Sequence, residues 1–286
     1  MPSLTMPDGT HLAYRVHTPP GPPSGRPPLL LLHGLAGHMG EWDAVRAYLL
    51  RDGHTVIEYD ARGHGASTRR PPTMTRAACV ADAATLIRKL GPAPATLIGQ
   101  SLGGHTALLT AAAHPDLVAS LILIEAGPGG PAPDLPSQIS TWLRSWPTPF
   151  KSLSSAETFL GHEAWARGLE EHPDGWHPRF DADQMTAAVA ELATHSYWDE
   201  WSRVTCPTLA VRGEHGTMPS AELEQMKARR PNTELMTIPD AAHDVHLDQP
   251  GHLYEAIAEF LHANDIAAPC DERSKTSPYP PAPPRH

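Results

Sequence analysis

Short apolar runs alternate with segments of helical periodicity along most of this chain. Runs that are apolar at every position, such as Leu29-Leu30-Leu31-Leu32, are typical of strands in a parallel sheet covered on both faces. Segments with such runs or with strand-like alternation are the predicted strands: residues 4–6, 11–17, 29–32, 55–59, 96–98, 121–124, 209–211 and 234–238. Segments with helical periodicity are the predicted helices: residues 42–51, 76–90, 102–113, 221–230 and 253–262. The alternation predicts an α/β fold, a mostly parallel central sheet with helices on both faces and functional sites at the strands' carboxyl ends.

The alternation stops between residues 128 and 203, where the pattern is helical and irregular and no strand is expected. We interpret 128–203 as a helical cap inserted into a core formed by 1–127 and 204–264, followed by a proline-rich, disordered tail at 265–286. The cap holds six of the seven tryptophans, which we expect mostly to pack in its own core. One or two could instead hold an apolar or aromatic substrate. The candidates are Trp142, Trp146, Trp165 and Trp198.

Composition narrows the classes of partner. The 286 residues can bury a substantial core, and a net charge of −10 disfavours nucleic acid or an anionic membrane as the main partner. The N-terminus lacks the basic and apolar regions of a signal peptide, and no aliphatic run is long enough to span a bilayer. The cysteines, Cys79, Cys206 and Cys270, have no metal-binding spacing and fit reduced thiols, so we expect a cytoplasmic protein. The 18 histidines include no H-E-x-x-H motif and are expected at the surface, so no metal site is predicted.

A serine between two glycines follows one of the predicted strands directly. Gly99-Gln100-Ser101-Leu102-Gly103 comes after the apolar run 95–98 and before the helical stretch 104–109. An abrupt turn from strand to helix would hold the serine in a strained conformation and leave no room for side chains beside it. Its hydroxyl would then stand at a helix N-terminus, where amides and the helix dipole favour negative charge. Ser101 is therefore the candidate nucleophile.

This pentapeptide resembles the nucleophile elbow of α/β-hydrolases. Other segments resemble family landmarks in the family's order, so that the resemblance covers residues from about 29 to 262: Leu32-His33-Gly34-Leu35, Asp60-Ala61-Arg62-Gly63-His64-Gly65 and Asp240-Ala241-Ala242-His243. The resemblance implies that His243 is the general base, with His246 as its rival. It also implies that the amides of Leu35 and Leu102 form the oxyanion hole. His33, Asp60 and His64 are expected to shape the loops rather than to react.

The acid of the expected triad is less clear, because the position where many relatives carry Asp is Gly216. Two carboxylates preserve the order serine, acid, histidine along the chain. Glu214 lies in the same turn as Gly216, and Glu125 follows the apolar run 121–124. The placement of Glu125 resembles one subgroup of haloalkane dehalogenases, which also tend to have a Glu-x-Gly turn like Glu214-His215-Gly216. We favour Glu125 and keep Glu214 as the alternative.

The resemblance to dehalogenases ends at the acid, because those enzymes and epoxide hydrolases need an Asp nucleophile. A serine nucleophile instead indicates acyl chemistry without a metal or organic cofactor. We expect hydrolysis of a small apolar or aromatic carboxylic ester or lactone through an acyl-enzyme. Carbon–carbon bond hydrolysis, perhydrolase activity, thioester hydrolysis and acyl transfer use the same triad and stay open. A non-catalytic ligand-binding module on the same fold is an alternative of a different class.

Overall fold

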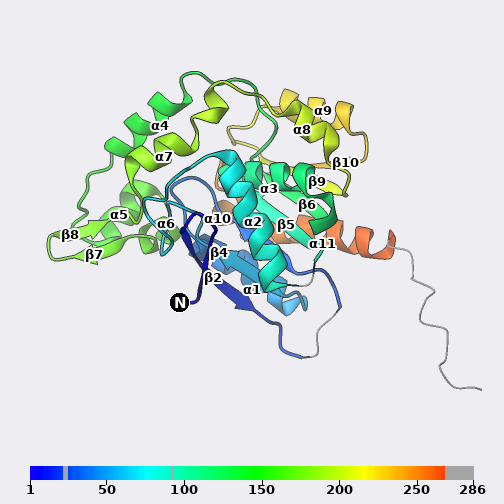
Figure 1. The fold of residues 1–286 in the computed structure, drawn as a ribbon, viewed down its shortest axis with the longest axis horizontal. Helices are drawn as coiled ribbons and strands as arrows, with labels where there is room; N and C mark the ends of the chain where they lie inside the picture. Colours follow the sequence, from blue (N-terminus) through cyan, green and yellow to red (C-terminus); the bar gives the residue numbers. More distant parts are fainter. Residues whose placement is uncertain (22–24, 92, 268–286) are drawn as a thin grey trace, which may run out of the picture.

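The computed structural model describes residues 1–21, 25–91 and 93–267. Its main sheet has the strand order β1-β2-β4-β3-β5-β6-β9-β10. Pairing is antiparallel between β1 and β2 and between β2 and β4, and parallel from β4 to β10. The strands span Ser3–Thr5, His11–His17, Val56–Tyr59, Leu29–Leu32, Ala95–Gln100, Val118–Ile124, Thr208–Gly213 and Thr233–Ile238, in sheet order. All the predicted strands are therefore present, and the mostly parallel sheet is confirmed (Figure 1).

Side chains of the central strands alternate between two apolar cores, one on each face of the sheet. Leu30 and Leu32 of β3 enter one core, whereas Leu29 and Leu31 enter the other. The first core is closed by α2 (Arg76–Leu90), α3 (Ser101–Ala113), α8 (Trp198–Arg203) and α9 (Ser220–Arg229). The second is closed by α1 (Asp43–Arg51), α10 (Val245–Asp248) and α11 (Pro250–Ala267). Burial of the central strands on both faces explains why they are apolar at every position.

Most predicted helices begin and end within a few residues of the observed ones. The segment predicted to begin at residue 42 begins instead with the short 3-10 helix η1 (Met39–Trp42), and a second one, η2 (Pro115–Leu117), precedes β6. Helix α11 extends to Ala267, into the start of the predicted tail. Residues 268–286, which contain most of that tail and Cys270, lie outside the described residues. No helix within the described residues is long and apolar enough to cross a membrane.

We call residues 128–203 the cap segment. It contains α4 (Leu135–Arg144), α5 (Leu153–Leu160), α6 (Glu163–Arg167), α7 (Ala182–Ala188) and η3 (Glu191–Ala193), followed by α8. Helices α4 and α7 pack together away from α8, which lies beside α9 on the main sheet (Figure 1). The expectation of no strand is wrong, because β7 (Glu170–His172) and β8 (Gly175–His177) form an antiparallel pair. These short, polar strands lack the apolar runs by which the other strands were predicted.

The histidines also depart from expectation, because several of them are buried rather than at the surface: His33, His54, His64, His105 and His246. A neutral imidazole can be buried at moderate cost when its nitrogens are hydrogen-bonded. His33 and His64 satisfy this condition in the loops that follow β3 and β4. Both ring nitrogens of His105 lack a partner among the described residues, and its ring packs edge-on against Tyr197.

Candidate active site

Four neighbouring strands of the sheet, β5, β6, β9 and β10, end at the same edge. Ser101 follows β5, Glu125 follows β6, residues 214–218 follow β9 and His243 follows β10. Parallel strands bring their carboxyl ends together, so residues far apart in sequence become neighbours here. The candidate site is assembled from these four strand ends.

The turn from β5 to α3 holds Ser101 in the left-handed region, with φ of 50°. Few residues other than glycine adopt this conformation, and they do so mostly at functional sites. A Cβ atom on Gly99 would lie 2.6 Å from the Gly103 carbonyl oxygen, and one on Gly103 would lie 2.3 Å from that of Leu32. Neither position has room for a side chain, which is the role predicted for the two glycines.

The imidazole of His243 reaches the serine hydroxyl, with Nε2 3.0 Å from Ser101 Oγ. This side chain is 38% exposed, so the site is open to solvent on the histidine side. The rival, His246, is fully buried, with Nε2 3.5 Å from Glu41 Oε2 and its ring against Trp42. Of these two histidines, His243 is therefore the one placed to exchange a proton with Ser101.

Glu125 contacts the other side of the same imidazole, with Oε2 3.2 Å from His243 Nδ1. Its backbone, like that of Ser101, is left-handed, with φ of 51°. The buried carboxylate also accepts hydrogen bonds from the amides of Gly213, Thr217 and Met218, at 2.9, 2.7 and 3.1 Å. Burial would raise the pKa of Glu125, but the hydrogen bonds from His243 and these amides outweigh it, and the pKa is lowered. The group is therefore held as a carboxylate beside the imidazole.

Gly216 explains how a glutamate on β6 fits at this place. A Cβ atom at residue 216 would lie 2.0 Å from Glu125 Oε1, so an aspartate there and the present carboxylate exclude each other. The alternative acid, Glu214, is exposed and accepts a hydrogen bond from the Asp240 amide at 3.1 Å. Glu214, His215 and Asp240 are exposed, and the atoms by which they could bind a metal ion lie within 4.8 Å of one another. The structure thus brings Glu125, and not Glu214, to His243.

Thr217 is a member of the site that the sequence analysis did not single out. Its hydroxyl lies 2.9 Å from His243 Nδ1 and 3.3 Å from Glu125 Oε2. It can accept from the imidazole N–H while donating to the carboxylate, because a hydroxyl does both. The position, one residue after Gly216, was the only available signal.

The loops expected to form the oxyanion hole are fixed by buried polar side chains. His64 Nε2 accepts from the amide of Ala36, next to Leu35, at 3.1 Å, and Ala36 has φ of 61°. Asp60 accepts from the amides of Met39 and Ala66, and His33 accepts from the amide of Ala61. These hydrogen bonds of His33, Asp60 and His64 are thus with the backbone of the loops. Leu35 lies after β3, and Leu102 is the second residue of α3, directly after Ser101.

An aromatic cluster of the cap segment faces this edge of the sheet. Trp142, Trp146 and Trp165 pack edge-on against one another, with ring centroids 5.5 to 6.1 Å apart. The side chains of Leu35 and Leu102 pack against the same apolar group as Trp146 and Trp165. Trp198 lies elsewhere, because it packs against the main core and under the Arg229 guanidinium.

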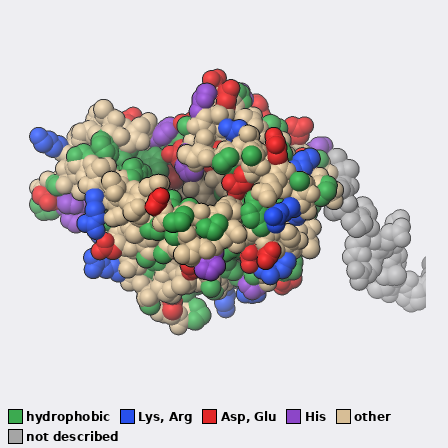
Figure 2. Space-filling model, turned by 90° about the horizontal axis from the view of Figure 1, so that it is seen from above, with side chains coloured by type: hydrophobic (Ala, Val, Ile, Leu, Met, Phe, Trp, Pro, Cys, Tyr) green, Lys and Arg blue, Asp and Glu red, His purple; other side chains and the backbone are tan. Residues whose placement is uncertain are grey.

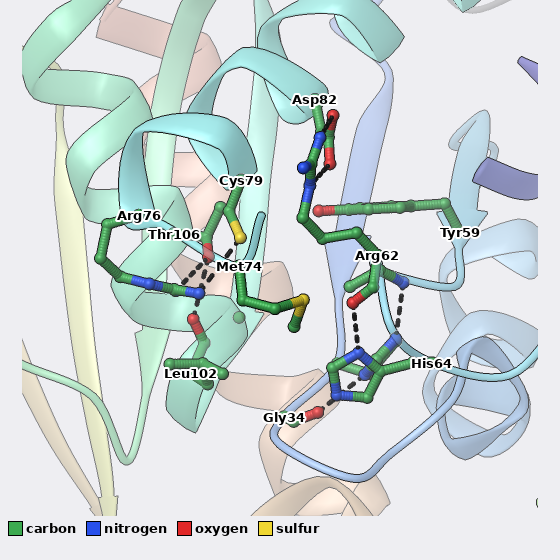
Figure 3. A pocket seen from close by; sticks show the side chains of 13 residues that line it. Gly34, Tyr59, Arg62, His64, Met74, Arg76, Cys79, Asp82, Leu102 and Thr106 are labelled. Carbon is green, nitrogen blue, oxygen red and sulfur yellow. Dashed lines mark hydrogen bonds and ion pairs between the residues drawn. The ribbon is translucent and has the colours of Figure 1, made fainter. Parts of the chain in front are cut away.

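A small cavity borders Leu102 and Gly34 beside the site (Figure 3). Its volume of about 20 Å³ has room for one water molecule. Arg62 forms a double hydrogen bond with Asp82 there, and Arg76 donates to Thr106 and Cys79.

From above, the molecular face is hollowed near its centre, and acidic side chains lie around the hollow (Figure 2). Cys79 and Cys206 are free thiols.

Residues 27–250 of the chain match the family model for the alpha/beta hydrolase fold. The chain belongs to this family. The α/β-hydrolase resemblance of the sequence is thereby confirmed, whereas the dehalogenase subgroup stays a prediction.

Relatives within the family are named as hydrolases of several kinds. The chain is 28% identical over 254 residues to the mouse sn-1-specific diacylglycerol lipase ABHD11, covering 82% of this chain and 81% of the relative. It is 28% identical over 262 residues to 2-(acetamidomethylene)succinate hydrolase of Mesorhizobium japonicum, covering 83% and 88%. A crystal structure of E-2-(acetamidomethylene)succinate hydrolase superposes with a TM-score of 0.80 at 24% identity, covering 91% of this chain and 98% of that one. The two named relatives support a hydrolase, and the superposition supports the fold.

Proposed function

We propose that this protein is a serine hydrolase that cleaves a carboxylic ester or lactone through an acyl-enzyme. The observation that carries the proposal is the continuous contact from Ser101 through His243 to Glu125 at one edge of the sheet. A serine hydroxyl is a weak nucleophile until an adjacent base accepts its proton, and that base needs an orienting carboxylate. Here His243 lies within hydrogen-bond distance of Ser101 on one side and of Glu125 on the other.

In the proposed reaction, Ser101 Oγ attacks the carbonyl carbon while His243 Nε2 accepts the hydroxyl proton. Glu125 and Thr217 hold the Nδ1–H side of the imidazole, and the carboxylate stabilises the imidazolium. The amides of Leu35 and Leu102 donate to the oxyanion of the tetrahedral intermediate. Collapse breaks the acyl carbon–oxygen bond, and His243 gives its proton to the departing alkoxide. Water then attacks the acyl carbon while His243 accepts its proton. As the bond between the acyl carbon and Ser101 Oγ breaks, His243 returns this proton to Oγ and the acid is released.

The surroundings of the serine favour an apolar or aromatic acyl group. Leu102, the residue after the serine, and Leu35 pack their aliphatic side chains against the apolar group that contains Trp146 and Trp165. Burial of apolar surface there contributes about 25 cal/mol per Å² to substrate binding. We therefore keep Trp142, Trp146 and Trp165 as candidate substrate contacts, and no cofactor takes part in the proposed steps.

A fluorophosphonate probe tests the proposal, because its phosphorus is attacked by an activated serine with loss of fluoride. We expect labelling of the wild-type protein at Ser101 and loss of labelling in Ser101→Ala. Folded wild-type protein that is not labelled would support a non-catalytic ligand-binding module instead.

A substrate panel then resolves the reaction. Short and long p-nitrophenyl esters, lactones, thioesters and a vinylogous diketone would be compared by kcat/KM. The proposal expects the highest values among esters or lactones. A preference of more than about tenfold, or about 1.4 kcal/mol, for the diketone or the thioesters would overturn it.

A further inference from the structure

The short helix α6 of the cap segment is attached to the loops that carry the catalytic groups. Trp165 donates through Nε1 to Asp244 Oδ2 at 3.1 Å, and Asp244 is the residue after His243. The N-cap residue of α6, His162, has Nε2 3.0 Å from Asp248 Oδ1. Asp248 in turn accepts from the amide of Ala242, the residue before His243, at 2.8 Å. Both chain neighbours of His243 are therefore linked to α6.

The contact of Trp165 with Asp244 also extends to the nucleophile. The other carboxylate oxygen of Asp244 accepts from Gln100 Nε2 at 3.3 Å, and the same amide nitrogen is 3.1 Å from the His243 carbonyl oxygen. Gln100 is buried and is the last residue of β5, directly before Ser101. One carboxylate thus joins the cap segment, the histidine loop and the nucleophile elbow.

A third contact fixes α6 against the loop after β3. His38 Nδ1 accepts from the Gly40 amide at 3.1 Å, so the ring proton lies on Nε2, which donates to the Ala164 carbonyl at 2.9 Å. A Cβ atom on Gly168, the C-cap residue of α6, would lie 2.5 Å from the His38 ring. The absence of a side chain at residue 168 is what allows this close approach.

We infer that Trp165 is a positioning residue whose indole N–H holds the His243 loop in register with Ser101 through Asp244. The inference rests on the proposed hydrolase mechanism. A loop held at two flanking residues keeps the imidazole within hydrogen-bond distance of the serine hydroxyl, and small misplacements of such groups cost rate steeply. Seating of α6 thereby becomes a condition for proton transfer, independently of any contact between the cap segment and substrate.

Trp165→Phe tests this role, because it removes the N–H donor and retains an aromatic ring. We expect kcat on p-nitrophenyl acetate and the labelling rate with a small fluorophosphonate to fall about five- to tenfold. KM for the acetate should change by less than about twofold, because neither small reagent depends on apolar contacts with the cap segment. Trp176→Phe is the matched control, since this cap tryptophan has no acceptor for its N–H among the described residues and should keep both rates.

A double-mutant cycle with Asp244→Ala separates positioning from packing. If the two side chains act through their contact, Trp165→Phe/Asp244→Ala should be no slower than Asp244→Ala alone, and Asp244→Asn should recover part of the loss. Circular dichroism would establish folding, and Asp244→Asn decides the question should Trp165→Phe not fold. Wild-type labelling rates in Trp165→Phe, or a change only in KM for bulky esters, would overturn the inference. Absence of labelling in the wild type would instead count against the hydrolase mechanism itself.

Discussion

The ends of β5 and β6 both place a residue other than glycine in the left-handed conformation, but glycines at different places make room for it. Each strand is followed directly by a residue other than glycine in the left-handed conformation, Ser101 with φ of 50° and Glu125 with φ of 51°. At β5, room for the turn comes from Gly99 and Gly103, two residues away on either side. At β6, room for the side chain comes from Gly216, which belongs to a different strand end.

The difference shows why one residue carries a local motif and the other does not. The nucleophile must project its hydroxyl outward, so only its own chain has to clear the way. The glutamate must turn its carboxylate inward among three backbone amides, so a distant segment has to clear the way. We expect substitutions at the β6 end to act through these non-local contacts.

Among the substitutions that test this comparison, Glu125→Gln should have the largest effect on kcat. The amide cannot stabilise the imidazolium, and its NH₂ group would face backbone N–H donors, so kcat on a p-nitrophenyl ester should fall by roughly 10³- to 10⁴-fold. The exposed Glu214→Gln is the control and should stay within about twofold of wild type. If Glu125→Gln kept near wild-type kcat while Glu214→Gln lost it, the acid that orients His243 would be Glu214 instead.

A second substitution tests the complementarity of Glu125 and Gly216. Gly216→Asp places atoms where the Glu125 carboxylate lies and should lower stability by about 1–3 kcal/mol, with a loss of about 10²-fold in kcat. Glu125→Ala/Gly216→Asp should be more active than either single variant, because the new carboxylate then has room beside His243. Kinetics and thermal unfolding of the three proteins measure both effects. An inactive double variant that is folded would show that space alone does not move the acid.

Thr217→Val sharpens the comparison with a smaller effect. It removes the hydroxyl that contacts His243 Nδ1 and Glu125 Oε2 and keeps the side-chain shape, so we expect kcat to fall about three- to tenfold. Thr217→Ser should restore most of the rate. Equal kcat for wild type and Thr217→Val would assign the orientation of His243 to Glu125 alone.

A still smaller effect, on the pH dependence of stability, is expected from His105. Its imidazole has no carboxylate or hydroxyl partner among the described residues, unlike that of His243. Burial lowers the pKa of His105 to about 3, and that of His64 likewise to about 3. Between this value and about 6.5 the unfolded chain binds protons that the folded chain does not, so stability should fall as the pH drops below about 6.5. Each such histidine contributes a slope of up to about 1.4 kcal/mol per pH unit.

His105→Leu should therefore flatten the dependence of unfolding free energy on pH between about 7 and 5, without lowering kcat. Urea unfolding at several pH values measures the slope. The exposed His252→Gln serves as control and should keep the wild-type slope. An unchanged slope in His105→Leu would mean that folding does not lower the pKa of this imidazole.

How much could be predicted from sequence follows the same division between local and distant constraints. Strands β3 to β6 and Ser101 were predictable because each is specified by adjacent residues. Glu125 could be placed only by its strand and by the unexpected glycine at 216. Thr217, Gln100 and Asp244 gain their contacts because the sheet brings several strand ends together, and no local pattern marks them.

The cap segment was less predictable for a related reason. Its apolar residues pack partly against one another and partly against other segments, which supply Ala36 and Met74 to the same apolar group, so local pattern carries little information about them. The pair β7–β8 is polar and short, and β8 pairs through Trp176 with Phe150 rather than with the main sheet. Trp198 is a tryptophan like the members of the aromatic cluster, but it packs against the main core.

The attachment of α6 has a consequence for engineering and for the history of such inserts. A cap that only covers its active site could be exchanged for another to change substrate preference. Here, exchange of the whole insert would also remove the donor to Asp244 and the partner of Asp248. Successful chimaeras should retain residues 162–168 with their host and vary the segments on either side. Substrate range would then diversify through changes elsewhere in the cap segment, while residues 162–168 stay the same.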